Sequence, residues 1–179
     1  AIRAACDRID PAFLGSPQYV HEGLTGRLGV PVIVKVETVN PIRSFKGRGT
    51  WLAINGLAAE DRIAADRPIL CVSAGNFGQG VAYAARALGI PAIVFVSRRA
   101  NRGKVDRMRA LGAEVIEAGE DFDAARSAAD EYRAEHDVEL LVDGDDVRLS
   151  TGAGTMALEV TDAVEAGDLP APVVASIPV

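Results

Sequence analysis

The sequence predicts an α/β protein, with a parallel sheet that carries helices on both faces. Short, continuously apolar runs alternate with helical segments along the middle of the chain, which is typical of strands buried on both sides. Of the 179 residues, 49% are hydrophobic and 25% are charged, as in soluble globular proteins. This length suffices for one ordinary domain or for parts of two.

Two elements are expected before the alternation begins. Residues 32–37 are rich in β-branched side chains and predict a strand. Asn40-Pro41 breaks the chain, and Ser44 can cap a helix that extends to about Ala59.

The alternation occupies residues 63–147, for which we predict a small α/β domain. The expected strands are 69–72, 92–96, 114–117 and 138–142, and the expected helices are 81–88, 101–111 and 121–135. Residues 1–62 and 148–179 are then expected to form an incomplete large domain. The chain starts without Met and stops just after an apolar run at 173–175 that is typical of a strand, so we expect a fragment.

Composition excludes several functions. A net charge of −6 and a pI near 5 argue against nucleic acid as a partner, because phosphate binding needs a basic surface. Two distant cysteines indicate a reducing compartment, and the polar amino end and the absence of a long apolar run indicate neither a signal peptide nor a membrane span. The expected location is the cytoplasm. His21 and His136 are isolated, which predicts no metal site.

The segment Ser73-Ala74-Gly75-Asn76-Phe77-Gly78-Gln79-Gly80 is the strongest local feature. It lies between an apolar strand and a helix, where free N–H groups and the helix dipole can bind an anion. Its G-x-x-G-x-G spacing differs from the dinucleotide fingerprint and from the phosphate loop. Taken alone, the segment fits a structural turn as well as a ligand site.

Lys46 stands in the first turn of the helix that Ser44 caps. The helix dipole there disfavours an ammonium, so the amine can act as a nucleophile that forms a Schiff base. Gly47 and Gly49 are expected to remove bulk beside it. The alternative is an exposed lysine in a loop.

Three further features have plain explanations. Thr151-Gly152-Ala153-Gly154-Thr155 is expected to be a glycine-rich turn that enters a helix. Asp143, Asp145 and Asp146 surround Gly144 and indicate a polar turn more than a cation site. Glu159 is expected to be a carboxylate on a helix face.

Taken together and in this order, these segments resemble the fold-type II enzymes that use pyridoxal 5'-phosphate (PLP), the tryptophan-synthase-β-like family. Residues 35–49 are similar to the family pattern K-x-E-x-x-x-P-x-x-S-F-K-x-R-G, and residues 73–80 are similar to its asparagine loop. Residues 111–115 resemble a structural turn of its small domain, and 152–160 resemble G-x-G-T-x-x-x-E-[ILV]. Within the family the likeness is greatest to the threonine/serine ammonia-lyases (dehydratases) and serine racemases.

The resemblance implies PLP as cofactor, a two-lobed fold and a role for each matching residue. Lys46 would hold PLP as a Schiff base and move the Cα proton. Phe45 would pack beside the cofactor ring, and Asn76 would hydrogen-bond its 3'-oxygen. Ser73, Ala74, Gly75 and Asn76 would bind the substrate carboxylate. The implied substrate is a small amino acid such as L-threonine or L-serine, and the implied assembly is a homodimer or larger.

The sequence departs from the family pattern at three places. Phe77 stands where many dehydratases carry His, which leaves the substrate less defined. Ile42-Arg43 replace Thr-Gly, and we expect Arg43 to face solvent. The family's glycine-rich phosphate loop would follow after residue 179.

Rival functions stay open. A β-replacement enzyme, a threonine synthase or an amino-acid racemase shares the fold, although the first two usually show T-S-G-N-T-G in place of residues 73–78. A rival of another class is a non-catalytic, truncated binding module. A nucleotide-binding domain is disfavoured by the missing fingerprints. The enzymatic interpretation requires the Lys46 nitrogen to lie near the 73–76 turn.

Overall fold

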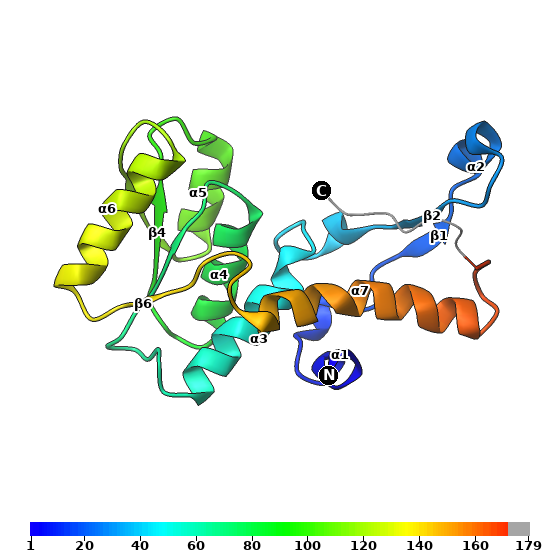
Figure 1. Ribbon diagram of the computed structural model, residues 1–179, viewed down its shortest axis with the longest axis horizontal. Helices are drawn as coiled ribbons and strands as arrows, with labels where there is room; N and C mark the ends of the chain where they lie inside the picture. The colour runs from blue at the N-terminus through cyan, green and yellow to red at the C-terminus, as the bar shows by residue number, and fades with distance from the viewer. Residues whose placement is uncertain (172–179) are drawn as a thin grey trace.

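The computed structural model describes residues 1–171 and contains a four-stranded parallel sheet (Figure 1). The strand order is β5-β4-β3-β6. Pairing is in register from Ile69↔Ala92 between β3 and β4, and from Ile93↔Glu114 between β4 and β5. The strands are β3 (Ile69–Val72), β4 (Ala92–Val96), β5 (Glu114–Glu117) and β6 (Glu139–Leu140). The predicted parallel sheet is confirmed.

Helices cover both faces of this sheet, because successive strand side chains point to opposite sides. Ile69 and Cys71 of β3 pack in one cluster with α4 (Asn76–Ala87) and α5 (Arg102–Ala110). Leu70 between them packs in another cluster with α6 (Phe122–Glu135). All three of these strand residues are fully buried. The prediction from the apolar run 69–72 that this strand is covered on both sides is therefore confirmed.

A second group of elements lies along the long helix α7 (Val147–Glu165), away from the sheet (Figure 1). Helix α3 (Lys46–Ala59) packs against both α7 and α4. Strands β1 (Gln18–Val20) and β2 (Ile33–Lys35) form an antiparallel pair. The remaining elements are α1 (Ile2–Cys6), α2 (Glu22–Leu28) and the 3-10 helices η1 (Pro11–Phe13) and η2 (Glu37–Val39). Between residues 1 and 171, no helix is both long and apolar enough to cross a membrane.

Two expected turns prove to be helical. Helix α4 begins at Asn76, so the second half of the glycine-rich segment 73–80 lies inside it. Helix α7 begins at Val147 because the Asp146 side chain accepts the N–H of Arg148, and Thr151–Thr155 therefore lies within the helix. The expected strand at 32–37 is shorter, and its end forms η2. The strand expected at 173–175 lies outside the described residues.

Candidate active site

The loop before α3 is held by one buried amide. Asn40 Nδ2 donates to the carbonyl oxygens of Glu37 at 2.8 Å and Ser44 at 3.0 Å. Asn40 Oδ1 accepts the N–H groups of Ile42 and Ser44, each at 3.2 Å. Ser44 Oγ then accepts the N–H of Lys46 at 3.3 Å, but the expected cap is not formed, because Phe45 is the N-cap residue and no side chain caps this helix. This loop fixes Lys46 as the first residue of α3.

The Lys46 amine lies where α3, α4 and the loop after β6 meet. Its Nζ is 2.8 Å from each carboxylate oxygen of Asp143. It is also 5.4 Å from the centre of the Phe45 ring and 5.9 Å from the centre of the Phe77 ring. The Lys46 side chain is 31% exposed. Because Phe77 belongs to the first turn of α4, the amine lies beside the glycine-rich segment and not in open solvent.

The turn before α4 offers unpaired backbone donors. Ser73 Oγ accepts the N–H groups of Gly75 at 3.2 Å and Gly78 at 3.1 Å, and the Ser73 N–H donates to the carbonyl oxygen of Phe95. Within the part of the chain that the structure describes, no acceptor is found for the N–H groups of Ala74, Asn76 and Phe77. Free N–H groups and the dipole at a helix start can bind an anion, so the anion site stays a prediction with which this geometry agrees.

The glycines of the turn have different roles. A Cβ added at Gly75 would meet nothing closer than Lys104 Nζ at 3.9 Å, so this backbone is open to a ligand. A Cβ at Gly78 would lie 2.7 Å from Met108 Sδ, and one at Gly80 would collide with Thr50. Only Gly75 therefore exposes the backbone, while the other two permit close packing.

The expectation that Gly47 and Gly49 clear space beside the lysine holds only for Gly49, which lines a hollow together with Lys46. A Cβ at Gly47 would collide with the Phe13 ring, so Gly47 serves a contact between elements. Gly49 serves such a contact as well, because a Cβ there would lie 2.5 Å from the carbonyl oxygen of Leu149.

Two hollows meet at this place. One of about 240 Å³ lies at the carboxyl ends of β3 and β6, and its lining includes Ser73, Ala74, Phe77 and Asp143. Another of about 130 Å³ is lined in part by Phe45, Lys46 and Asp143. Phe45 and Lys46 thus line one hollow, Ser73 and Ala74 line the other, and Asp143 lines both. Gly75 and Asn76 line neither hollow, and Asn76 Oδ1 accepts a weak hydrogen bond from Gln79 Nε2 at 3.4 Å.

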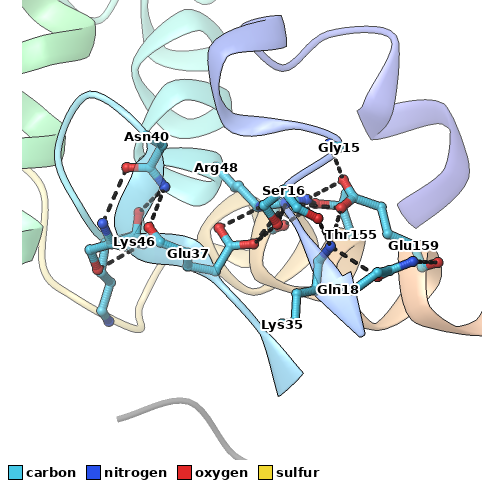
Figure 2. A network of polar contacts seen from close by, with 12 residues as sticks. Gly15, Ser16, Gln18, Lys35, Glu37, Asn40, Lys46, Arg48, Thr155 and Glu159 are labelled. Atoms are coloured by element: carbon cyan, nitrogen blue, oxygen red, sulfur yellow. Dashed lines mark hydrogen bonds and ion pairs between the residues drawn. The ribbon is translucent and has the colours of Figure 1, made fainter. Parts of the chain in front are cut away.

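Behind Lys46 on α3, a buried guanidinium joins distant segments (Figure 2). Arg48 is fully buried and pairs with Glu37 at 2.9 Å and with Glu159 at 2.6 Å. It also donates to Thr155 Oγ1 at 3.0 Å and to Ser16 Oγ at 3.2 Å. Because these partners come from the amino-terminal segment and α7, the network holds α3 in place.

The charges of this network stabilise one another. Burial would by itself raise the pKa of Glu159, but hydrogen bonds from Arg48 and Lys35 outweigh burial and lower it. Burial would likewise lower the pKa of Arg48, and its bonds to Glu159 and Glu37 raise it instead. Both groups are thus held in their charged forms. Glu159, expected to be a carboxylate on a helix face, is a member of this network.

Sequence reasoning missed Asp143 as a site residue. The polar turn expected around Gly144 is present, and Asp146 begins α7 from it. Asp143 itself reaches Lys46 across 97 positions of the chain. No local pattern could indicate this contact. Arg43, expected in solvent, is exposed.

Comparison with known proteins gives one family. The family model described as "Pyridoxal-phosphate dependent enzyme" matches residues 9–178. The L-threonine dehydratase biosynthetic IlvA of Mycobacterium tuberculosis is 35% identical over 167 residues, covering 92% of this chain and 38% of that protein. The L-threonine ammonia-lyase of Geobacter sulfurreducens is 37% identical, covering 75% of this chain and 33% of that protein.

Solved structures agree. The processed form of threonine deaminase isoform 2 from Solanum lycopersicum has a TM-score of 0.77 and 31% identity, covering 90% of this chain and 43% of that one. A PLP-dependent aspartate racemase has a TM-score of 0.83 and 26% identity, covering 94% of this chain and 51% of that one. This chain spans about two fifths of the first curated relatives and about half of the solved chains.

Proposed function

This chain belongs to the family of pyridoxal-phosphate-dependent enzymes, and on that premise we propose that it catalyses β-elimination of L-threonine or L-serine to a 2-keto acid and ammonia. The single observation that carries the proposal is the place of the Lys46 amine. It lies within 6 Å of the centres of two aromatic rings, one of which belongs to Phe77 in the first turn of α4. An accessible amine near a helix start that can bind an anion is what an amino-acid substrate and an aldehyde cofactor need.

Phe45 and Lys46, which line one hollow together, fit the ring and the aldehyde of PLP, whereas Asn76 lines neither hollow and bonds to Gln79. Lys46 would hold the cofactor, Phe45 would pack beside it, and Asn76 would bind its 3'-oxygen. When bound, PLP would supply an electron sink for the pair left at the substrate Cα. The proposal thus keeps the roles that the resemblance implied.

The chain's own groups would do the rest. Once displaced by the substrate amine, Lys46 Nζ would take the Cα proton as a general base. The free N–H groups of the turn, with the hydroxyl hydrogen of Ser73, would orient the carboxylate and so the Cα–H bond, which is a positioning effect. The apolar wall at Phe77 and Leu141 suits the methyl group of threonine.

The names of the more similar relatives favour elimination over replacement and racemisation. Those with 35–37% identity are named as threonine dehydratases or ammonia-lyases, whereas the aspartate racemase is 26% identical. Incubation with serine and with threonine, followed by product analysis, separates elimination from replacement and racemisation. Keto acid and ammonia are the expected products.

Replacement of Lys46 tests the proposal. Lys46→Ala should abolish both the yellow absorbance of bound PLP and the activity, because the amine that would hold the aldehyde covalently is removed. Lys46→Arg is the matched variant, since it keeps a cation opposite Asp143 but cannot form the Schiff base. Full activity in either variant would reject the mechanism. A wild-type protein that shows no absorbance change on PLP titration would favour the non-catalytic binding module.

The remaining expectations stay proposals. They are a homodimer or larger assembly, a cytoplasmic location and no nucleic-acid or membrane partner. Light scattering of the purified protein measures the assembly directly.

A further inference from the structure

The contact between Asp143 and Lys46 is the closest interaction at the site. Both oxygens of the carboxylate lie 2.8 Å from Nζ, which is the length of a charge-assisted hydrogen bond. Among residues 1–171, the Asp143 carboxylate has no other hydrogen bond or ion pair. The carboxylate is therefore directed at this amine alone.

The loop that carries Asp143 is built to present it. Gly144 has φ of +98°, a conformation that side-chain-bearing residues rarely adopt, and it turns the chain between β6 and α7. Asp145 N–H donates to the carbonyl oxygen of Val142 at 3.3 Å, and Asp146 begins α7. Of the three aspartates, only Asp143 lines the two hollows.

We propose that Asp143 is a catalytic acid–base residue that exchanges a proton with Lys46 Nζ. The inference rests on the proposed function, because it concerns the reaction of this amine with the cofactor aldehyde. It assigns chemistry to a residue that the family pattern quoted from the sequence does not include.

An ammonium has no free electron pair, so Lys46 must lose a proton before it can attack a carbonyl carbon. One N–H bond would break, its electron pair would stay on nitrogen, and an O–H bond would form on Asp143. The nitrogen pair would then bond to the aldehyde carbon, and the aldehyde oxygen would leave as water. One hydrogen of that water would come from the lysine nitrogen and the other from Asp143, which would thereby return to its carboxylate form.

A purely electrostatic role for Asp143 predicts the opposite effect. A carboxylate that only pairs with the ammonium would hold the lysine in its unreactive form. Removing that carboxylate would then speed the reaction with PLP. A proton acceptor, in contrast, speeds the reaction, and its loss slows it. The sign of the change therefore decides between the two roles.

The experiment measures how fast Lys46 captures PLP, without any substrate. Wild-type protein, Asp143→Asn and Asp143→Ala are mixed with PLP, and the growth of the yellow absorbance is recorded. Borohydride reduction and peptide mass analysis then locate the modified lysine. Asp145→Asn is the matched control, because Asp145 is exposed two positions away and lines neither hollow.

We expect Lys46 in Asp143→Asn to capture PLP at least about tenfold more slowly than in the wild type, toward the lower end of general-base effects. Asp145→Asn should match the wild type. Added acetate should restore the rate of Asp143→Ala, because it can enter the space left by the side chain, and a merely structural defect would not respond. An unchanged or faster Asp143→Asn, or a slowed Asp143→Ala that acetate leaves slow, would overturn the proposal. If wild-type Lys46 is never modified, the proposed function fails instead.

Discussion

At the scale of single residues, Arg48 shows where sequence reasoning stops. Lys35, Glu37, Arg48 and Glu159 all stand in segments that resemble the family. Their individual charges do not say which of them meet. The structure brings them together across up to 124 positions, as for Lys35 and Glu159. A surface carboxylate and a buried one look alike in a helical pattern, because burial depends on which segment packs over it.

Removing the guanidinium should be costly. Arg48→Met would leave the buried Glu37 carboxylate without its ion pair, while Glu159 would keep Lys35, and breaking a buried pair typically costs about 3–5 kcal/mol in the free energy of unfolding. Urea unfolding of the purified protein measures the change. Arg3→Met is the control, since its pair with Asp162 is exposed and solvent-screened and should contribute little to stability. Equal effects of the two substitutions would contradict a structural role for the network.

At the scale of elements, three strands of the parallel sheet were predictable in full. The strand expected at 138–142 is shorter, β1 was not expected, and the starts of two helices were missed. The runs 69–72, 92–96 and 114–117 have the predicted bounds, because a strand buried on both sides needs a continuous apolar sequence. Glycine, by contrast, indicated turns at 73–80 and 151–155. In the structure many of these positions need glycine because a neighbouring element lies where a Cβ would be, as α3 does at Gly152. Such contacts between elements leave no local signal.

The crossing of α3 and α7 gives the prediction at this scale. A Cβ added at Gly152 would lie 2.5 Å from the backbone N and Cα of Gly49, which cannot move aside as a side chain could. Gly152→Ala should therefore destabilise the protein by about 1–3 kcal/mol, the usual cost of overpacking. Thermal unfolding followed by circular dichroism measures it.

Gly26→Ala in α2 supplies the matched control. Nothing lies within 4 Å of a Cβ at this position, so only helix propensity changes. Alanine is favoured over glycine inside a helix by up to about 1 kcal/mol, and the control should be neutral or stabilising. If Gly152→Ala were stabilising as well, the close approach of the helices would not depend on that glycine.

At the scale of the whole molecule, carboxylates paired with arginines tie the parts of the chain together. The pKa of Glu117 is lowered by Arg109 and Arg102, and that of Asp146 by Arg148. The pKa of Asp162 is lowered by Arg3. Glu159 is partly buried, and its hydrogen bonds from Arg48 and Lys35 lower its pKa in spite of that burial. The net charge of −6 was predictable from composition, but these pairings were not.

These lowered pKa values predict the direction of acid unfolding. A carboxyl whose pKa is lower in the folded protein binds fewer protons there than in the unfolded chain, so its stabilisation is present above its ordinary value, 4.5 for Glu159, and is lost as the pH falls through the folded value. The urea concentration at the unfolding midpoint should therefore stay nearly constant around neutral pH and fall below about pH 5. Glu159→Gln should flatten this fall by more than Glu117→Gln, because the Glu117 carboxyl pairs at the exposed surface where solvent screens it. Equal slopes in these two variants would show that the buried network does not govern the response to acid.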